Sequence, residues 1–223
     1  MQKQSKLIRN MVYCAIFTVL ITVGAYIRIP IPGVPFTLQF LFVMLAGLML
    51  EATFAFLSVM LYIFIGLLGL PVFTQGGGFA YVLQPTFGYL LGFAVAALVV
   101  GLIRKRINMR GRLLTKSAPR TLKQHPDNTM PLVRSDAEPL TNLSSSKKTL
   151  FLQYFCLSLL GIVIMYICGV TYMYFIARHY LHFNHDIRYL LMVGVVLQLP
   201  GDLALAVVSA YIANRTNPLI SRI

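Results

Sequence analysis

The feature that most constrains this chain is a series of long apolar runs that are almost free of charged residues. A helix needs about 20 mostly apolar residues to cross the roughly 30 Å hydrocarbon core of a bilayer. The composition agrees, because 58% of the residues are hydrophobic and only 11% are charged, whereas soluble domains have about 25% charged residues. We therefore predict an all-α membrane protein, with residues 1–223 forming a single membrane domain.

The apolar runs predict six transmembrane helices in one bundle. In chain order they cover residues 7–27, 36–50, 53–70, 81–103, 150–176 and 189–213. The second run is short, and the tight junction at Glu51 predicts that the second and third helices form a hairpin. The first run is too long for the apolar part of a secretory signal and is followed by no small-residue cleavage pattern, so we expect it to be retained.

The basic residues predict the orientation of the helices. Sixteen of the nineteen Lys and Arg residues lie in the N-terminal tail, in the 104–149 segment or near the C-terminus. Six spans place these regions on one side, and such basic segments stay in the cytoplasm. Both termini are therefore expected to be cytoplasmic. The polar, proline-containing 104–149 segment is predicted to be a flexible cytoplasmic linker, whose basic cluster either only orients the chain or also touches anionic lipid headgroups.

Several function classes lack support in the residues. The net charge of +13 suggests nucleic acid, but the basic residues surround no nucleic-acid-binding module. The sequence has no Walker A loop, no HExxH motif and no nucleophile elbow, so we predict no catalytic residue and no cofactor. The three cysteines lie in apolar runs without paired spacing. His179, His182 and His185 are close in sequence, but their aromatic-rich surroundings favour an interfacial segment over a metal site.

Two segments on the predicted outer side combine irregular backbone with polar side chains. Three prolines within residues 30–35 prevent a helix and lead into Thr37 and Gln39. Further along, Gly76, Gly77 and Gly78 form either a flexible turn or a backbone that a ligand can approach closely. Non-helical backbone at membrane depth persists only when it is buried in protein or lines a cavity.

The residues that flank the glycine run favour the pocket interpretation. Gln75 precedes the glycines, and Phe73, Tyr81 and Tyr89 supply aromatic surface nearby. Apolar walls with a few polar groups are typical of small-molecule sites.

Asp202 is the acidic residue that lies well inside a predicted span. A charge at the centre of a membrane helix costs at least about 2.5–3.5 kcal/mol. Pro200 and Gly201 precede it and are predicted to break the helix and begin a new half-helix. The Asp202 side chain either caps that half-helix or accepts hydrogen bonds from a ligand, and the two roles are compatible.

Taken in order, these motifs resemble those of the BioY family, the biotin-binding S components of energy-coupling factor (ECF) transporters. The similar segments are residues 24–27 (GAYI), 29–39 (IPIPGVPFTLQ), 66–73 (GLLGLPVF), 76–78, 85–86 (PT), 88–93 (GYLLGF), 165–170 (MYICGV) and 199–202 (LPGD). The resemblance covers the chain apart from the 104–149 segment. It implies a six-helix S-component fold in a bacterial inner membrane.

The resemblance also implies a function and partners. The chain would capture biotin at the outer face and dock on a transmembrane scaffold subunit driven by two ATPase subunits, which fits the missing nucleotide site. We expect the ureido ring to be bound by Asp202, Thr37, Gln39 and Gln75, and the rest of the ligand to be enclosed by aromatic side chains. The full predicted site is Thr37, Gln39, Phe73, Gln75, Gly76, Gly77, Gly78, Tyr81, Tyr89 and Asp202.

Three positions depart from the family pattern. Leu205 stands where the family usually has a basic residue, which leaves the ligand carboxylate unassigned. Gln84 and Phe87 replace glycines and are expected to reduce the room in the pocket. The basic residues of the outer loops, Arg28, Arg178 and Arg188, are candidate replacements. The change at Leu205 also keeps an alternative open, in which the chain is a self-sufficient carrier or channel for biotin or a related small molecule.

Overall fold

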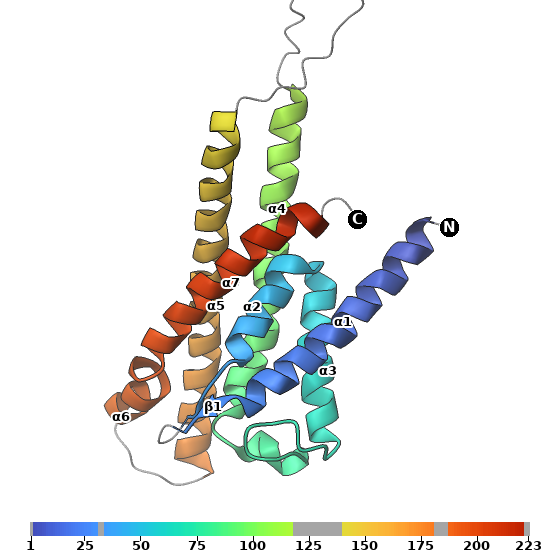
Figure 1. Ribbon diagram of the computed structural model, residues 1–223. Helices are drawn as coiled ribbons and strands as arrows, with labels where there is room; N and C mark the ends of the chain where they lie inside the picture. The colour runs from blue at the N-terminus through green and yellow to red at the C-terminus, as the bar shows by residue number, and fades with distance from the viewer. Residues whose placement is uncertain (1, 31–33, 118–139, 181–186, 221–223) are drawn as a thin grey trace, which may run out of the picture.

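The computed structural model describes residues 2–30, 34–117, 140–180 and 187–220, and helices dominate them (Figure 1). The α-helices are α1 (Gln2–Tyr26), α2 (Gln39–Met49), α3 (Ala52–Leu67), α4 (Phe87–Ser117), α5 (Leu140–His179), α6 (Ile187–Leu191) and α7 (Leu199–Ile220). Four shorter elements join them, namely strands β1 (Arg28–Ile29) and β2 (Phe36–Thr37), the 3₁₀ turn η1 (Phe79–Leu83) and the π-helical turn η2 (Met192–Val196). The prediction of an all-α membrane fold is confirmed.

Four helical stretches in the described part of the chain are long and apolar enough to cross a membrane. They are Gln4–Tyr26, Phe87–Met109, Lys148–His179 and Arg188–Thr216. The hairpin helices α2 and α3 are apolar but shorter. At 1.5 Å per residue, the 11 residues of α2 span only about half of the hydrocarbon core. The extended segment with β2 that precedes α2 therefore has to occupy part of the bundle depth.

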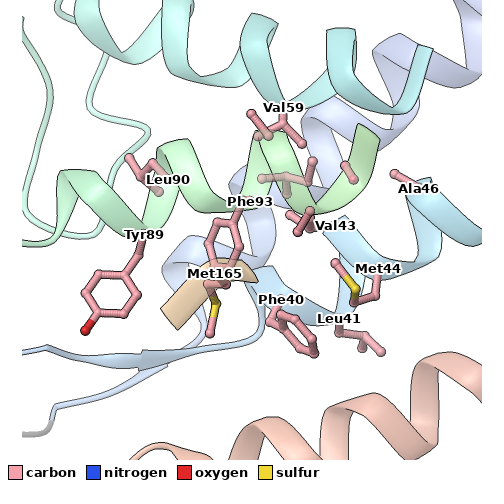
Figure 2. Close-up of a cluster of buried hydrophobic side chains, with 14 of the residues drawn as sticks. Phe40, Leu41, Val43, Met44, Ala46, Val59, Tyr89, Leu90, Phe93 and Met165 are labelled. Atoms are coloured by element: carbon pink, nitrogen blue, oxygen red, sulfur yellow. The ribbon is translucent and has the colours of Figure 1, made fainter. Parts of the chain in front are cut away.

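The helices pack closely where small residues face each other. A Cβ atom added at Gly47 of α2 would lie 3.1 Å from the Val100 side chain of α4, and one at Gly101 of α4 would lie 2.7 Å from the Cα of Ala52 in α3. Such contacts bring helix backbones together, as is common in membrane bundles. The central core lies between α2, α4 and α5, where Phe40, Phe93 and Met165 point toward one another (Figure 2).

Two predicted boundaries were wrong. The fourth span begins at Phe87 rather than at residue 81, because Gln84 precedes Pro85 and takes an extended conformation with ψ 135°. The segment between the fourth and fifth spans is shorter than the predicted 104–149 linker, because α4 continues to Ser117 and α5 begins at Leu140. No proline interrupts either extension, and the basic residues there are good helix formers. Residues 118–139 lie outside the described part.

The sixth span is interrupted and a new helix begins near Pro200, as predicted, but the irregular backbone lies before Pro200 rather than at Pro200 and Gly201. The irregular backbone covers η2 and the turn that follows it, and Pro200 is already the second residue of α7. Proline is tolerated in the first turn of a helix, where its missing N–H group has no partner to lose. The backbone N–H of Asp202 donates to the carbonyl of Gln198 at 3.0 Å, so the helix continues through the predicted break.

Candidate functional site

A hollow opens between α2, α4, α5 and α7, beside β2. The strands lie at the end of the bundle away from both termini (Figure 1). The empty space of the hollow is about 470 Å³, a volume that includes the open, solvent-filled mouth. Six polar residues line it: Thr37, Gln39, Thr74, Thr86, Gln198 and Asp202. Aromatic and apolar side chains supply the remaining surface, so the hollow has the mixed lining that small-molecule binding requires.

The wall formed by α5 and α7 carries a buried carboxylate. Tyr166 of α5 donates a hydrogen bond from its hydroxyl to Oδ2 of Asp202 at 2.5 Å, and Asp202 is only 3% exposed. A charge-assisted hydrogen bond of this length is stronger than a neutral one. Because an ionised carboxylate has room for several donors, Asp202 keeps acceptor capacity for a ligand in the hollow.

Gln39, at the start of α2, is held in one orientation. Its Nε2 donates to the hydroxyl of Tyr62 at 2.8 Å, and Tyr62 in turn donates to the carbonyl of Val72 at 3.3 Å. The hydroxyl of Thr37 donates to Oε1 of Gln39 at 3.4 Å. This chain of bonds connects β2, α2, α3 and the 68–78 loop, and it presents a fixed amide to the hollow.

Tyr81 of η1 forms another polar wall. Its hydroxyl lies 3.0 Å from Oγ1 of Thr74 and accepts a hydrogen bond from Oγ1 of Thr86 at 3.4 Å. All three residues line the hollow. The loop before η1 and the residue before α4 are therefore joined through one tyrosine.

The segment around β2 is fastened to α7. Gln198 donates from Nε2 to the carbonyl of Val34 at 3.2 Å. The ring of Phe36 lies so close to Gly201 that an added Cβ atom would be 2.4 Å from it. The glycine before Asp202 thus allows the extended segment to approach α7 and close one side of the hollow.

Comparison with known proteins places the chain in a family. It matches the BioY family over residues 1–222. The chain belongs to the BioY family. A probable biotin transporter BioY from Lysinibacillus sphaericus is 38% identical, over 96% of this chain and 89% of the relative. The biotin transporter BioY from Thermotoga maritima is 34% identical, over 95% and 97% of the two chains.

The fold of this BioY chain is similar to a solved structure described as the S-component for biotin from an ECF-type ABC transporter, determined at 2.1 Å. The TM-score is 0.69 with 21% sequence identity, and the match covers 96% of this chain and 93% of the other. The six-helix S-component arrangement expected from the sequence is confirmed, and this BioY chain is a multi-pass membrane protein.

Half of the predicted site residues line the hollow of this BioY chain. They are Thr37, Gln39, Tyr81, Tyr89 and Asp202. Tyr89 donates its hydroxyl to the carbonyl of Gly194 at 2.9 Å, and its ring meets that of Tyr166 edge-on at 6.4 Å. Asp202 does not cap the half-helix as one interpretation had it, because it lies within the first turn of α7 and bonds to Tyr166.

The other predicted residues build the loop behind the hollow. The ring of Phe73 is 3% exposed and packs 4.4 Å from that of Tyr81, so it supports the wall from behind. Gly76 and Gly78 have φ of +113° and +105°, values that favour glycine, and Gly77 passes so close to Leu70 that a Cβ atom would lie 2.1 Å from its carbonyl oxygen. Gln75 is exposed.

The sequence prediction missed four polar site residues, and also apolar lining residues such as Phe40, Leu90, Phe93 and Met165. Thr74, Thr86 and Gln198 line the hollow, and Tyr166 supplies the donor to Asp202. Thr86 and Tyr166 lie inside motifs that resemble the family, and Gln198 directly precedes another. Proximity to these motifs was therefore an available signal.

The expected loss of room at two family positions was wrong. Gln84 is exposed, and Phe87 is buried against Tyr172 at a ring distance of 5.9 Å, so neither lines the hollow. Leu205 is half-buried against the apolar core. Of the three histidines weighed as a metal site, His182 and His185 lie outside the described residues, and the described residues contain no cluster suited to a metal ion.

Proposed function

We propose that this chain is the biotin-binding subunit of an uptake transporter and that it captures biotin at the end of the bundle that carries β1 and β2. One observation carries the proposal: a hollow open at one end of the bundle holds a buried carboxylate together with fixed hydroxyl, amide and aromatic groups. The near full-length relatives that are called biotin transporters support biotin as the ligand.

The lining suits the chemistry of biotin. The ureido ring offers two N–H donors and a carbonyl acceptor, and an ionised Asp202 supplies the matching acceptor. The hydroxyl groups of Thr37, Thr74 and Thr86 line the hollow, and one of them would exchange its present partner, Gln39 or Tyr81, to donate to the ureido carbonyl. The sulfur-containing ring and the alkyl chain need apolar surface, which Phe40, Phe93, Leu90 and Met165 provide between α2, α4 and α5.

The proposal assigns ATP-driven movement to partner subunits. The chain has no phosphate-binding loop, and we propose that a transmembrane scaffold and two ATPase subunits complete the transporter. The start of α1 and the end of α7 lie away from β1 and α6 (Figure 1), and most basic residues belong to that end. By the positive-inside tendency, the termini are then cytoplasmic and the hollow faces outward.

A binding assay with the purified protein tests the function. Labelled biotin should bind saturably, and Asp202→Asn should weaken binding by about 10- to 150-fold, because a hydrogen bond to a charged group contributes about 1.5–3 kcal/mol. Tyr211→Phe is a matched control, since Tyr211 is 55% exposed on the outside of α7. Absence of saturable binding at micromolar biotin would refute the proposal.

A transport assay separates the proposal from the alternative of a self-sufficient carrier, which Leu205 motivates. Liposomes that contain this chain alone should take up no biotin above background. Uptake should appear when the scaffold and ATPase subunits are added with ATP. Uptake by this chain alone would instead favour the carrier.

A further inference from the structure

We infer that Arg28 binds the carboxylate of the ligand at the mouth of the hollow and makes the site selective for the acidic ligand over a neutral analogue. This inference rests on the proposed function, because it takes biotin as the ligand. The sequence offered Arg28 only as one of three candidates, and the structure is what distinguishes it from Arg178.

The charge distribution in the hollow indicates that a positive side chain outside its lining binds the ligand carboxylate. Among the lining residues that the structure describes, Asp202 is the only one with a formal charge, and it is negative. A second carboxylate brought next to Asp202 would be repelled, most strongly where water is excluded. Biotin therefore binds with its ureido ring toward Asp202 and its carboxylate away from it, where a positive group is needed.

Arg28 is connected to the lining on two sides. It lies on β1 and is paired across the two-stranded sheet with Thr37 of β2. Its guanidinium Nη1 also donates a hydrogen bond to the carbonyl of Thr74 in the 68–78 loop. Thr37 and Thr74 both line the hollow. The guanidinium is thus bonded to one lining residue, Thr74, while the backbone of Arg28 is paired with another, Thr37.

The guanidinium keeps the capacity to bind a carboxylate. It has five N–H donors in a planar fork, and the bond to Thr74 uses one of its nitrogens. A fork of this kind matches a carboxylate in a two-point arrangement. Arg28 is exposed, so the charge remains solvated in the empty site and costs little to maintain.

Arg178 and Arg104 make hydrogen bonds away from the hollow. Arg178, in the last turn of α5, donates to the hydroxyl of Tyr174 at 2.7 Å, which is a contact within its own helix. Arg188 lies on the short helix α6. Arg104 donates to the carbonyls of Leu48 and Leu50 near the opposite end of α2. Among Arg28, Arg104 and Arg178, Arg28 is the one with both a strand pairing and a hydrogen bond to lining residues.

Biotin and biotinamide, which differ in charge but share both rings, test the inference on the purified full chain. The wild type should bind biotin more tightly. Arg28→Gln should weaken biotin binding about five- to tenfold and leave biotinamide binding unchanged, because it removes one partly solvated charged contact. Arg28→Lys should restore part of the preference, and raising the ionic strength should reduce the preference of the wild type.

Arg178→Gln and Arg188→Gln serve as matched controls and should keep the wild-type preference. Equal weakening of both ligands by Arg28→Gln would show that Arg28 only positions the loop, and would overturn the inference. The inference would also be overturned if Arg28→Gln kept the wild-type preference for biotin over biotinamide, or if either control variant lost that preference. If the wild type binds neither ligand, the proposed function itself fails, which is a different outcome from a protein that binds biotin without using Arg28.

Discussion

Substituting Gly66 near the end of α3 should damage the site without touching its lining. A Cβ atom at this position would lie 2.1, 2.4 and 2.5 Å from three atoms of the Phe73 ring, whereas ordinary contacts begin near 3.4 Å. In Gly66→Ala the nearest ring atom must therefore move away by about 1.3 Å or more to reach normal carbon separations. It cannot do so freely, because the rings of Tyr62 and Tyr81 pack on it at 5.4 and 4.4 Å.

The expected cost has two parts. Overpacking of a core costs about 1–3 kcal/mol in the free energy of unfolding, which corresponds to a fall in Tm of roughly 2–10 °C for a chain of this length. A displaced Tyr81 also weakens its contacts with Thr74 and Thr86. Since a neutral hydrogen bond contributes about 1 kcal/mol, biotin affinity should fall about fivefold.

Thermal unfolding in detergent and biotin binding measure the two parts. Leu68→Ala is the control, because Leu68 follows α3 directly and is 68% exposed. The double variant Gly66→Ala with Phe73→Leu should be more stable than the sum of the single effects predicts, because the smaller side chain relieves the overlap. Wild-type stability and affinity in Gly66→Ala, or strictly additive effects in the double variant, would refute the reasoning.

Two further predictions concern the end of the bundle away from the hollow. Arg104→Gln should lower the free energy of unfolding by about 1–3 kcal/mol, because the Arg104 side chain donates hydrogen bonds to the carbonyls of Leu48 and Leu50 where α2 ends. Thermal unfolding measures this change, and an unchanged Tm would contradict the role of Arg104. Nζ of Lys6 lies 2.6 Å from Oε1 of Glu51. The hydrogen bond between them is the largest effect that lowers the pKa of Glu51 below its ordinary value of 4.5. The stabilisation by this ion pair is therefore complete above about pH 4.5 and is lost as the pH falls through the lowered pKa. The Tm of the wild type should exceed that of Glu51→Gln, and this difference should shrink in the acidic range. A difference that grew as the pH fell would contradict the prediction. The pair is half-exposed, so high salt should also reduce this small difference.

Several elements of the site could be recognised in the sequence because their signals are local. Asp202 stands out as an acidic residue in an apolar run, and the prolines before Thr37 exclude a helix. The glycine run was also recognised, but its role differed. Gly76 and Gly78 are needed for positive φ in the supporting loop, and composition alone does not distinguish this from contact with a ligand.

The sequence by itself determined the membrane class, the family and the approximate helices, because hydrophobicity and the order of motifs depend only on the order of residues along the chain. The tertiary structure alone decided the partners inside the site. Tyr166 meets Asp202 from 36 residues away, Tyr89 reaches the carbonyl of Gly194 from 105, and Gln198 reaches that of Val34 from 164. Such pairs depend on how neighbouring helices slide and rotate against one another, and close packing at glycines sets that register.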